Sequence, residues 1–198
     1  LDVGQGQSIL LQSEGRTYLI DCGGDRATEA ADIAAETILS QGISRLDGII
    51  VTHYDADHAG GIPYLLNRIP ADAVFLPEIA DETGLGEEIR NLADSACILV
   101  KKDLLLTFGS TKITIFGPEL YDIGNESSLC VLFQTENCDI LVTGDRGELG
   151  EMLLLHRTRL PKLELLIAGH HGSAYSTGEE LLNATSPEYV IISAGKNN

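Results

Sequence analysis

Two histidines and two aspartates occur within six residues of the segment Thr52–Gly61, which reads T-H-Y-D-A-D-H-A-G-G. They are His53, Asp55, Asp57 and His58. Imidazole nitrogens and carboxylate oxygens are ligands that Zn, Mn and Fe accept, and four of them in one turn are enough to serve two ions. The plain alternative is a solvated polar loop with ion pairs. The spacing H-x-D-x-D-H favours a metal site.

The segment is expected at the end of a strand. Leu46–Thr52 is an apolar run typical of a buried strand, and Ile62–Arg68 has a helical pattern after the two glycines. Loops at strand ends are where α/β proteins place their sites, because the scaffold fixes the backbone while the side chains project into a crevice.

The remaining elements alternate hairpins with crossovers, which predicts an α/β protein with mixed sheets rather than one parallel sheet. The predicted hairpins pair Ser8–Gln12 with Thr17–Asp21, Leu104–Thr107 with Lys112–Phe116, and Leu129–Gln134 with Asp139–Thr143. The further helices expected are Ala27–Gln41, Glu87–Ala96, Glu148–His156 and Gly178–Asn183, and the further strands are Ala73–Leu76, Ile98–Lys101, Leu163–Ala168 and Tyr189–Ser193.

Composition excludes several classes of protein. The chain has 198 residues, of which 43% are hydrophobic, enough for one ordinary core, so we expect a single domain over residues 1–198 and no intrinsic disorder. No apolar run reaches the roughly 20 residues of a membrane helix. The four cysteines form no C-x-x-C pair, so no zinc knuckle or disulfide framework is expected. The net charge of −17 disfavours binding of nucleic acid through bulk charge.

The histidine and aspartate segment resembles the hallmark loop H-x-H-x-D-H of the metallo-β-lactamase superfamily, with Asp55 at the middle histidine. That variant is characteristic of the β-lactamase-like domain of ComEC-type competence proteins and their stand-alone relatives. The resemblance implies an αββα sandwich, with two mixed β-sheets and helices on the outer faces. Five further segments are similar to motifs of this branch in its order: Leu1–Gly6 to D-V-G-Q-G-D, Leu19–Gly24 to a strand ending in D-x-G, Leu141–Asp145 to L-x-T-G-D, Ala168–Ser173 to G-H-H-G-S, and Ile192–Asn198 to S-x-G-x-x-N.

The resemblance also implies a ligand set. His53 and Asp55 would line one metal position, Asp57 and His58 the other, and Asp145 would bridge them. Asp145 also precedes a predicted helix. An N-cap is therefore the alternative interpretation of this carboxylate. Of the pair that follows the strand Leu163–Ala168, we expect His170 to complete the metal site and His171 to act on the substrate, whereas the plain alternative is an exposed pair at a turn.

The sequence departs from the family in two places. Metallo-β-lactamases supply another histidine before the bridging aspartate, but this chain has none between His58 and His156, and Gly124–Ser128 stands there instead. One site therefore lacks a nitrogen ligand, which shifts its preference from Zn toward Mn or leaves it weakly occupied. The opening motif ends in Gln7 where the branch has Asp, which removes a carboxylate.

Glycines and polar side chains near these motifs suggest further roles. Gly4 and Gly6 indicate a tight turn that brings backbone against the metal loop, not a phosphate cradle, since no helix follows them. The candidate substrate contacts are Ser173, Ser176 and Thr177, near a helix start that favours anions, and Lys196. Ser176 and Thr177 would serve equally well as ordinary N-caps. Lys196 and Arg146 are the cations adjacent to these motifs. Either could hold a phosphodiester, although a solvated surface charge is the commoner fate of such a residue.

The sequence predicts a hydrolase that uses one or two Mn or Zn ions, with Asp57 orienting or deprotonating the attacking water. The resemblance implies a nuclease for single-stranded DNA during uptake. The alternatives are a hydrolase for a small phosphoryl ester or lactone, and a catalytically weak partner-binding module. The resemblance also implies a piece of a longer protein with membrane domains, at the extracytoplasmic face of the bacterial membrane. A stand-alone relative would be secreted or cytoplasmic.

Overall fold

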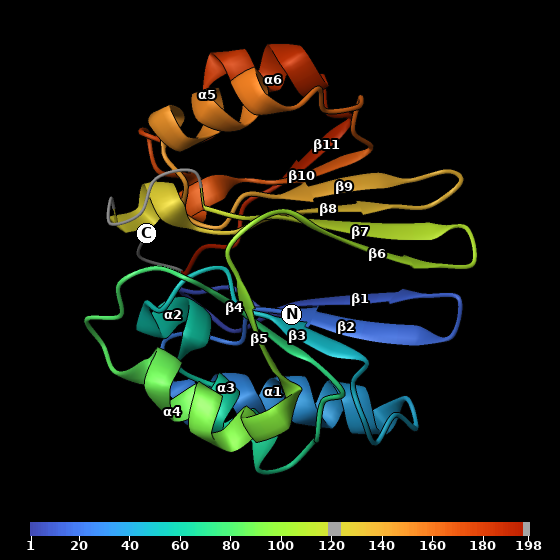
Figure 1. The fold of residues 1–198 in the computed structure, drawn as a ribbon, viewed down its shortest axis with the longest axis vertical. Helices are drawn as coiled ribbons and strands as arrows, with labels where there is room; N and C mark the ends of the chain where they lie inside the picture. The colour runs from blue at the N-terminus through green and yellow to red at the C-terminus, as the bar shows by residue number, and fades with distance from the viewer. Residues whose placement is uncertain (119–123, 196–198) are drawn as a thin grey trace. The chain divides into compact units, whose positions relative to one another are not determined.

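The computed structural model describes residues 1–118 and 124–195 (Figure 1). The chain divides into two compact units. The first unit holds Leu1–Leu76, Asp81–Leu99 and the described chain from Ala194 onward, and the second holds Pro77–Ala80 and Val100–Ser193. Nearly all of one mixed sheet lies in the first unit, and a second mixed sheet lies in the other. The predicted α/β class with two mixed sheets is confirmed.

The sheet of the first unit has the strand order β1-β2-β3-β4-β5. β1 and β2 are antiparallel, as a hairpin requires, whereas β2, β3 and β4 run parallel, with Tyr18 opposite Gly48. Helices α1, α3 and α4 cover one face of this sheet (Figure 1). The strands are β1 (Ile9–Ser13), β2 (Arg16–Ile20), β3 (Gly48–Ile50), β4 (Val74–Pro77) and β5 (Cys97–Val100), and the helices are α1 (Ala27–Ser40), α2 (Ala56–Ala59), α3 (Ile62–Leu66), α4 (Leu85–Ala93) and the 3-10 turn η1 (Asp94–Ala96).

The sheet of the second unit has the order β11-β10-β9-β8-β7-β6. Strands β6 to β9 form an antiparallel meander, and β9, β10 and β11 run parallel. Helices α5 and α6 lie together on one face (Figure 1). The strands are β6 (Leu104–Phe108), β7 (Thr111–Phe116), β8 (Cys130–Gln134), β9 (Asp139–Val142), β10 (Leu165–Ile167) and β11 (Tyr189–Ile191), and the helices are η2 (Gly124–Ser127), α5 (Glu148–Arg157), η3 (Gly169–Gly172) and α6 (Glu179–Thr185).

Aliphatic side chains fill the core of each unit. In the first, Leu19 and Ile20 of β2 and Ile49 and Ile50 of β3 have no exposed surface. In the second, a cluster around Leu141 and Leu154 joins β9 to α5. Fully burying one such side chain contributes about 1.5–3 kcal/mol relative to leaving it in water. These cores fix the strand ends from which the polar loops project.

The predicted elements are present, with ends shifted by a few residues. The strand expected over Leu46–Thr52 is the largest change, because only Gly48–Ile50 is paired as strand β3. The short helix α2 was not predicted. It occupies four residues of the loop that carries the metal-ligand pattern, and a single turn leaves no periodicity in the sequence to detect.

Candidate metal-binding residues

The predicted metal loop follows β3 and enters α2. His53 and His58 are buried, and their ring centroids lie 4.2 Å apart with the planes tilted by 48°. Asp55 is exposed, and its Oδ2 lies 3.7 Å from Nε2 of His53, while Asp57 is half-buried. The first unit thus brings the two predicted imidazoles together at a strand end.

Gly6 of the opening segment and Gly23, which follows β2, let the backbone approach this loop. A Cβ on Gly6 would lie 2.6 Å from the carbonyl oxygen of Asp57, and one on Gly23 would lie 2.3 Å from it. Gly6 also has φ +154°, a conformation that side-chain-bearing residues rarely adopt. The predicted turn role of Gly6 is therefore confirmed.

A buried carboxylate organises the histidines of the first unit. Asp21 has no exposed surface, and its φ of 56° turns it out of strand β2. Its Oδ1 accepts the backbone N–H of Thr52 at 2.7 Å, and its Oδ2 accepts the Thr52 hydroxyl at 2.7 Å and the Gln7 amide at 2.8 Å. Nδ1 of His58 lies 2.8 Å from the same oxygen. Sequence reasoning assigned no role to Asp21, although its D-x-G motif was the available signal.

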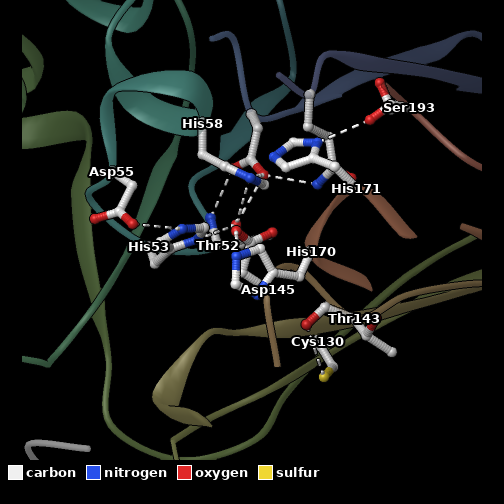
Figure 2. A network of polar contacts seen from close by, with 12 residues as sticks. Thr52, His53, Asp55, His58, Cys130, Thr143, Asp145, His170, His171 and Ser193 are labelled. Carbon is white, nitrogen blue, oxygen red and sulfur yellow. Dashed lines mark hydrogen bonds and ion pairs between the residues drawn. The ribbon is translucent and has the colours of Figure 1, made fainter. Parts of the chain in front are cut away.

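These contacts determine the tautomer of both rings. An ionised carboxylate only accepts, so Nδ1 of His58 carries the proton that faces Asp21. The Thr52 hydroxyl gives its one proton to Asp21, so it accepts from Nδ1 of His53, 3.0 Å away (Figure 2). Each ring therefore keeps its lone pair on Nε2. A carboxylate or hydroxyl on the far nitrogen is the usual support of a metal-binding histidine.

In the second unit, Asp145 follows β9 and is 3% exposed. The N-cap of α5 is Gly147, and no side chain caps this helix. The alternative interpretation of Asp145 as an N-cap is therefore wrong. Its Oδ2 lies 3.9 Å from Nε2 of His170 (Figure 2). A buried carboxylate beside an imidazole suits the predicted ligand role.

His170 and His171 occupy the turn η3 in an unusual backbone conformation. Both have positive φ, 48° and 53°, which is rare for residues with a side chain. His171 is buried, and its Nδ1 lies 2.8 Å from the carbonyl oxygen of Ser193, so Nδ1 carries the proton and Nε2 the lone pair. The side chain of His170 is 44% exposed. The second unit fixes His171, rather than His170, as a metal ligand is usually fixed.

The hydroxyls that the sequence suggests as substrate contacts make hydrogen bonds within this turn and the loop that follows it. The Ser176 hydroxyl donates to the carbonyl of Gly169 at 2.7 Å, and the Gly169 N–H donates to Oγ1 of Thr177 at 2.9 Å. The N-cap of α6 is Gly178, so neither hydroxyl caps that helix. Ser173 accepts the N–H of Tyr175 at 3.3 Å. Lys196 lies outside the described residues.

Glu151 of α5 holds the far end of the same loop. Its carboxylate accepts the backbone N–H groups of Thr177 at 2.6 Å and Gly178 at 2.8 Å. Burial raises the pKa of Glu151, the two N–H groups lower it, and the nearby carboxylates of Glu148 and Glu126 raise it further. The loop that carries the two histidines is thus tied to α5.

Arg146 is a structural residue, not a surface cation. It has no exposed surface, and its guanidinium donates to three backbone carbonyls, those of Ser128 at 2.7 Å and of Gly150 and Gly117 at 3.3 Å each. The expectation of a solvated charge or phosphate contact at Arg146 is wrong. The guanidinium has five donors, which lets one side chain satisfy several buried carbonyls.

The donor set fits a divalent metal ion. Each unit presents at least one buried imidazole whose Nε2 bears the lone pair. The first unit carries Asp55 and Asp57 in the same loop as its histidines, and the second carries the buried Asp145, whose Oδ2 lies 3.9 Å from Nε2 of His170. Nitrogen and oxygen donors of this kind suit Zn, Mn and Fe. Carboxylates make up a large part of the candidate donor set, because Asp55 stands where the family's loop has a histidine.

The comparisons agree with this fold. The sequence model of the metallo-beta-lactamase superfamily matches residues 1–196, so the chain belongs to that superfamily. The whole chain is 31% identical to ComE operon protein 3 of Bacillus subtilis (strain 168) and 30% identical to competence protein ComA of Neisseria gonorrhoeae, both ComEC-type competence proteins. Human short-form tRNase Z shares the fold, with a TM-score of 0.60 and 17% identity over 98% of this chain and 90% of that one.

The resemblance to the ComEC branch of the superfamily is thereby confirmed. The chain spans only 28% and 27% of the two competence proteins. Membership in the superfamily implies hydrolase chemistry with a divalent metal. No helix among residues 1–118 and 124–195 is both long and apolar enough to cross a membrane.

Proposed function

We propose that this chain is a metal-dependent phosphodiesterase that cleaves single-stranded DNA. The observation that carries the proposal is the buried pair His53 and His58, whose Nε2 lone pairs are set by Thr52 and Asp21. A purely structural pair of histidines has no need of a buried carboxylate on one ring and a hydroxyl relay on the other. The choice of substrate rests on the names of the competence relatives.

We assign the metal ligands to both units. In the first they are His53, Asp55, Asp57 and His58. In the second they are Asp145 and His171, with His170 free to contact the substrate because its side chain is 44% exposed. This assignment reverses the order that we expected for the two histidines from the sequence. It follows from the burial of His171 and its bond to the Ser193 carbonyl.

Bound divalent ions would lower the pKa of a water and stabilise charge on the phosphoryl oxygens. The residues of the chain supply orientation and proton transfer. Asp57 would orient the water and accept its proton, because it is half-buried on α2 next to His58. His170, exposed on a braced turn, would donate a hydrogen bond to a phosphoryl oxygen. The carbonyl of Ser193 and the carboxylate of Asp21 keep the ligand rings from rotating.

The net charge of −17 favours a second candidate, a hydrolase for a small phosphoryl ester or lactone. A small substrate carries few charges, so an acidic surface repels it less than a polyanion. We further propose that the chain is one part of a longer competence-type protein at the extracytoplasmic face of the membrane. Neighbouring parts of that protein would then deliver the strand against the repulsion.

Cleavage of end-labelled single-stranded DNA with added Mn²⁺ or Zn²⁺ tests the proposal. We expect metal-dependent cleavage by the wild type, and a loss of about 10²–10⁴-fold in Asp57→Ala, the usual effect of removing a general base. The folding of Asp57→Ala should be unchanged, because the Gln7 N–H bonds to the Asp57 backbone carbonyl, which alanine retains. Asp25→Ala is the matched control, since Asp25 is an exposed aspartate near the same loop.

Two results would contradict the nuclease proposal, and a third would overturn the role given to Asp57. Metal-bound protein that cleaves small phosphate esters but not DNA would support the second candidate. Protein without bound metal would leave a partner-binding module on a hydrolase fold. Full activity in folded Asp57→Ala would overturn the role of that carboxylate.

A further inference from the structure

Gln7 is buried against the carboxylate that organises the first unit's histidines. It is 3% exposed, and its Nε2 donates to Oδ2 of Asp21 at 2.8 Å. The similar motif of the ComEC branch ends in Asp at this position. The sequence alone therefore suggested a lost carboxylate, whereas the structure shows a gained hydrogen-bond donor.

The backbone of Gln7 holds this amide in place. Its N–H donates to the carbonyl of Asp57 at 2.9 Å, and its carbonyl accepts the N–H of Gly23 at 3.0 Å. Asp57 belongs to α2 beside His58, and Gly23 lies two residues after Asp21. Gln7 is therefore joined to both segments of the Asp21–His58 pair by three hydrogen bonds.

The other hydrogen bonds to Asp21 have a different origin. They come from the N–H and hydroxyl of Thr52 and from Nδ1 of His58, so all three belong to the strand-end loop itself. Among the described residues, the Gln7 amide is the donor to this carboxylate from outside that loop. It restrains Asp21 independently of the residues that Asp21 must orient.

The choice of amide rather than carboxylate has a physical reason. An amide offers two N–H donors and no charge, whereas an ionised carboxylate only accepts. A carboxylate 2.8 Å from Asp21 would set two acceptors against each other inside the protein, where charge repulsion is poorly screened. The amide therefore favours a fixed Asp21 carboxylate that faces His58.

We propose that Gln7 is a positioning residue. Its amide holds the Asp21 carboxylate where it keeps the proton of His58 on Nδ1 and presents Nε2 to a metal ion. The metal part of this inference rests on the proposed function. The tautomer part concerns the protein alone, so the two can fail separately.

The test compares Gln7→Glu and Gln7→Met with Gln134→Glu in the same chain. Glutamate keeps the size of Gln7 but loses the donor and adds a charge, whereas methionine only loses the donor. Gln134 is the matched control because its Nε2 also donates to an aspartate, Asp139, at 3.2 Å. Long-range ¹H–¹⁵N NMR of the imidazoles in metal-free protein reports the tautomer, and competition with a chromophoric chelator reports Zn²⁺ affinity.

We expect Gln7→Glu to populate the Nε2–H tautomer of His58 and to weaken Zn²⁺ binding by about 10–100-fold, the usual cost of losing an outer-shell partner. Gln7→Met should shift both quantities in the same direction by less, and it decides the question if Gln7→Glu does not fold. Gln134→Glu should change neither.

Wild-type His58 signals and wild-type affinity in folded Gln7 variants would overturn the inference. If the wild type binds neither Zn²⁺ nor Mn²⁺, the proposed function fails. A tautomer shift in the metal-free Gln7 variants would still support the positioning role in that case, and its absence would overturn it.

Discussion

Each unit encloses one fully buried charge next to predicted ligands, and the two charges act differently. Asp21 in the first unit accepts hydrogen bonds from side chains, including a proposed ligand ring. Arg146 in the second unit follows the proposed ligand Asp145 and donates to the backbone carbonyls of three separate segments. The first charge therefore orients side chains, whereas the second fixes the loops from which ligands project.

The difference extends to the histidines. His53 and His58 lie on ordinary backbone, and polar side chains set their rings. His170 and His171 instead have left-handed backbone, which costs energy and must be maintained by its surroundings. Bonds from Ser176, Thr177 and Glu151 supply that support. An imidazole held by side chains should lose its orientation when one neighbouring side chain is replaced. An imidazole placed by its backbone conformation should keep its orientation after such a single substitution.

The largest effect is expected for Asp21→Ala. The change leaves the Thr52 hydroxyl, the His58 Nδ1–H and the Gln7 amide without their acceptor, and it places alanine at φ 56°. Each buried donor left without its acceptor costs about 1–3 kcal/mol, so the loss of three acceptor contacts should cost at least about 3 kcal/mol. Urea unfolding measures the loss. Asp25→Ala, which removes an exposed aspartate, should cost under about 1 kcal/mol, and an equally small cost for Asp21→Ala would contradict the account.

The next effect distinguishes the two histidines of the second unit. Removing an outer-shell partner weakens metal binding by roughly 10–100-fold, and removing a ligand should weaken it more. His171→Ala should therefore weaken Zn²⁺ binding by more than about 100-fold. His170→Ala should weaken it by less than about tenfold. Chelator competition gives both constants. The reverse ranking would restore His170 as the ligand, as the sequence alone suggested.

Arg146→Lys should destabilise the second unit by about 1–3 kcal/mol, because an ammonium cannot serve three carbonyls with the fixed fork of a guanidinium. The same variant should alter Zn²⁺ affinity less than Asp21→Ala does. Urea unfolding and chelator competition on one preparation measure both quantities. A larger loss of affinity than of stability would show that Arg146 acts on the ligands directly.

The smallest effect concerns Cys22, which lies between Asp21 and Gly23. Burial raises its pKa from 9.0 to about 12, the nearby Ser8 hydroxyl lowers it in part, and the negative charge of Asp21 raises it further. Because the folded state favours the neutral thiol, Cys22 makes its full contribution to the free energy of unfolding below about pH 9. That contribution is lost as the pH rises toward about 12. At pH 8 the folded protein should leave Cys22 unlabelled by a thiol reagent, while the partly exposed Cys97 and Cys138 react.

Mass spectrometry of the labelled peptides measures this protection, and Cys22→Ser removes the corresponding peptide signal. Labelling of Cys22 as fast as Cys97 in folded protein would show that the Asp21 turn opens readily. The buried network of the first unit would then be looser than its distances indicate.

The sequence allowed much of the fold and the ligand set to be predicted, because both depend on local patterns. Apolar runs and turn residues located the hairpins, and the spacing of His53 and His58 located the metal loop. The roles of Gln7 and Arg146 were misjudged for a common reason. Each makes its polar contacts with residues distant in the sequence, Gln7 with Asp21 and Arg146 with Gly117 and Ser128. No local pattern records such partners.

The choice between His170 and His171 illustrates the same limit. The two residues are adjacent and identical in type, so the sequence offers no basis for ranking them. The burial of His171 and its contact with Ser193 separate their environments, and neither feature leaves a periodicity in the sequence. Ser176 and Thr177 were similarly ambiguous, because a hydroxyl near a helix start suits a cap, a ligand or a loop brace.

Metal content is the most direct test of the claim that the buried histidines of both units are ligands. The wild type, His58→Ala, His171→Ala and the exposed control His156→Ala would be purified with Mn²⁺ and Zn²⁺ supplied, and the metal per chain would be measured by mass spectrometry. We predict one or two ions per chain in the wild type and in His156→Ala, with a clear loss in each of the other two variants. Wild-type protein without metal, or undiminished metal in folded His58→Ala and His171→Ala, would contradict the account.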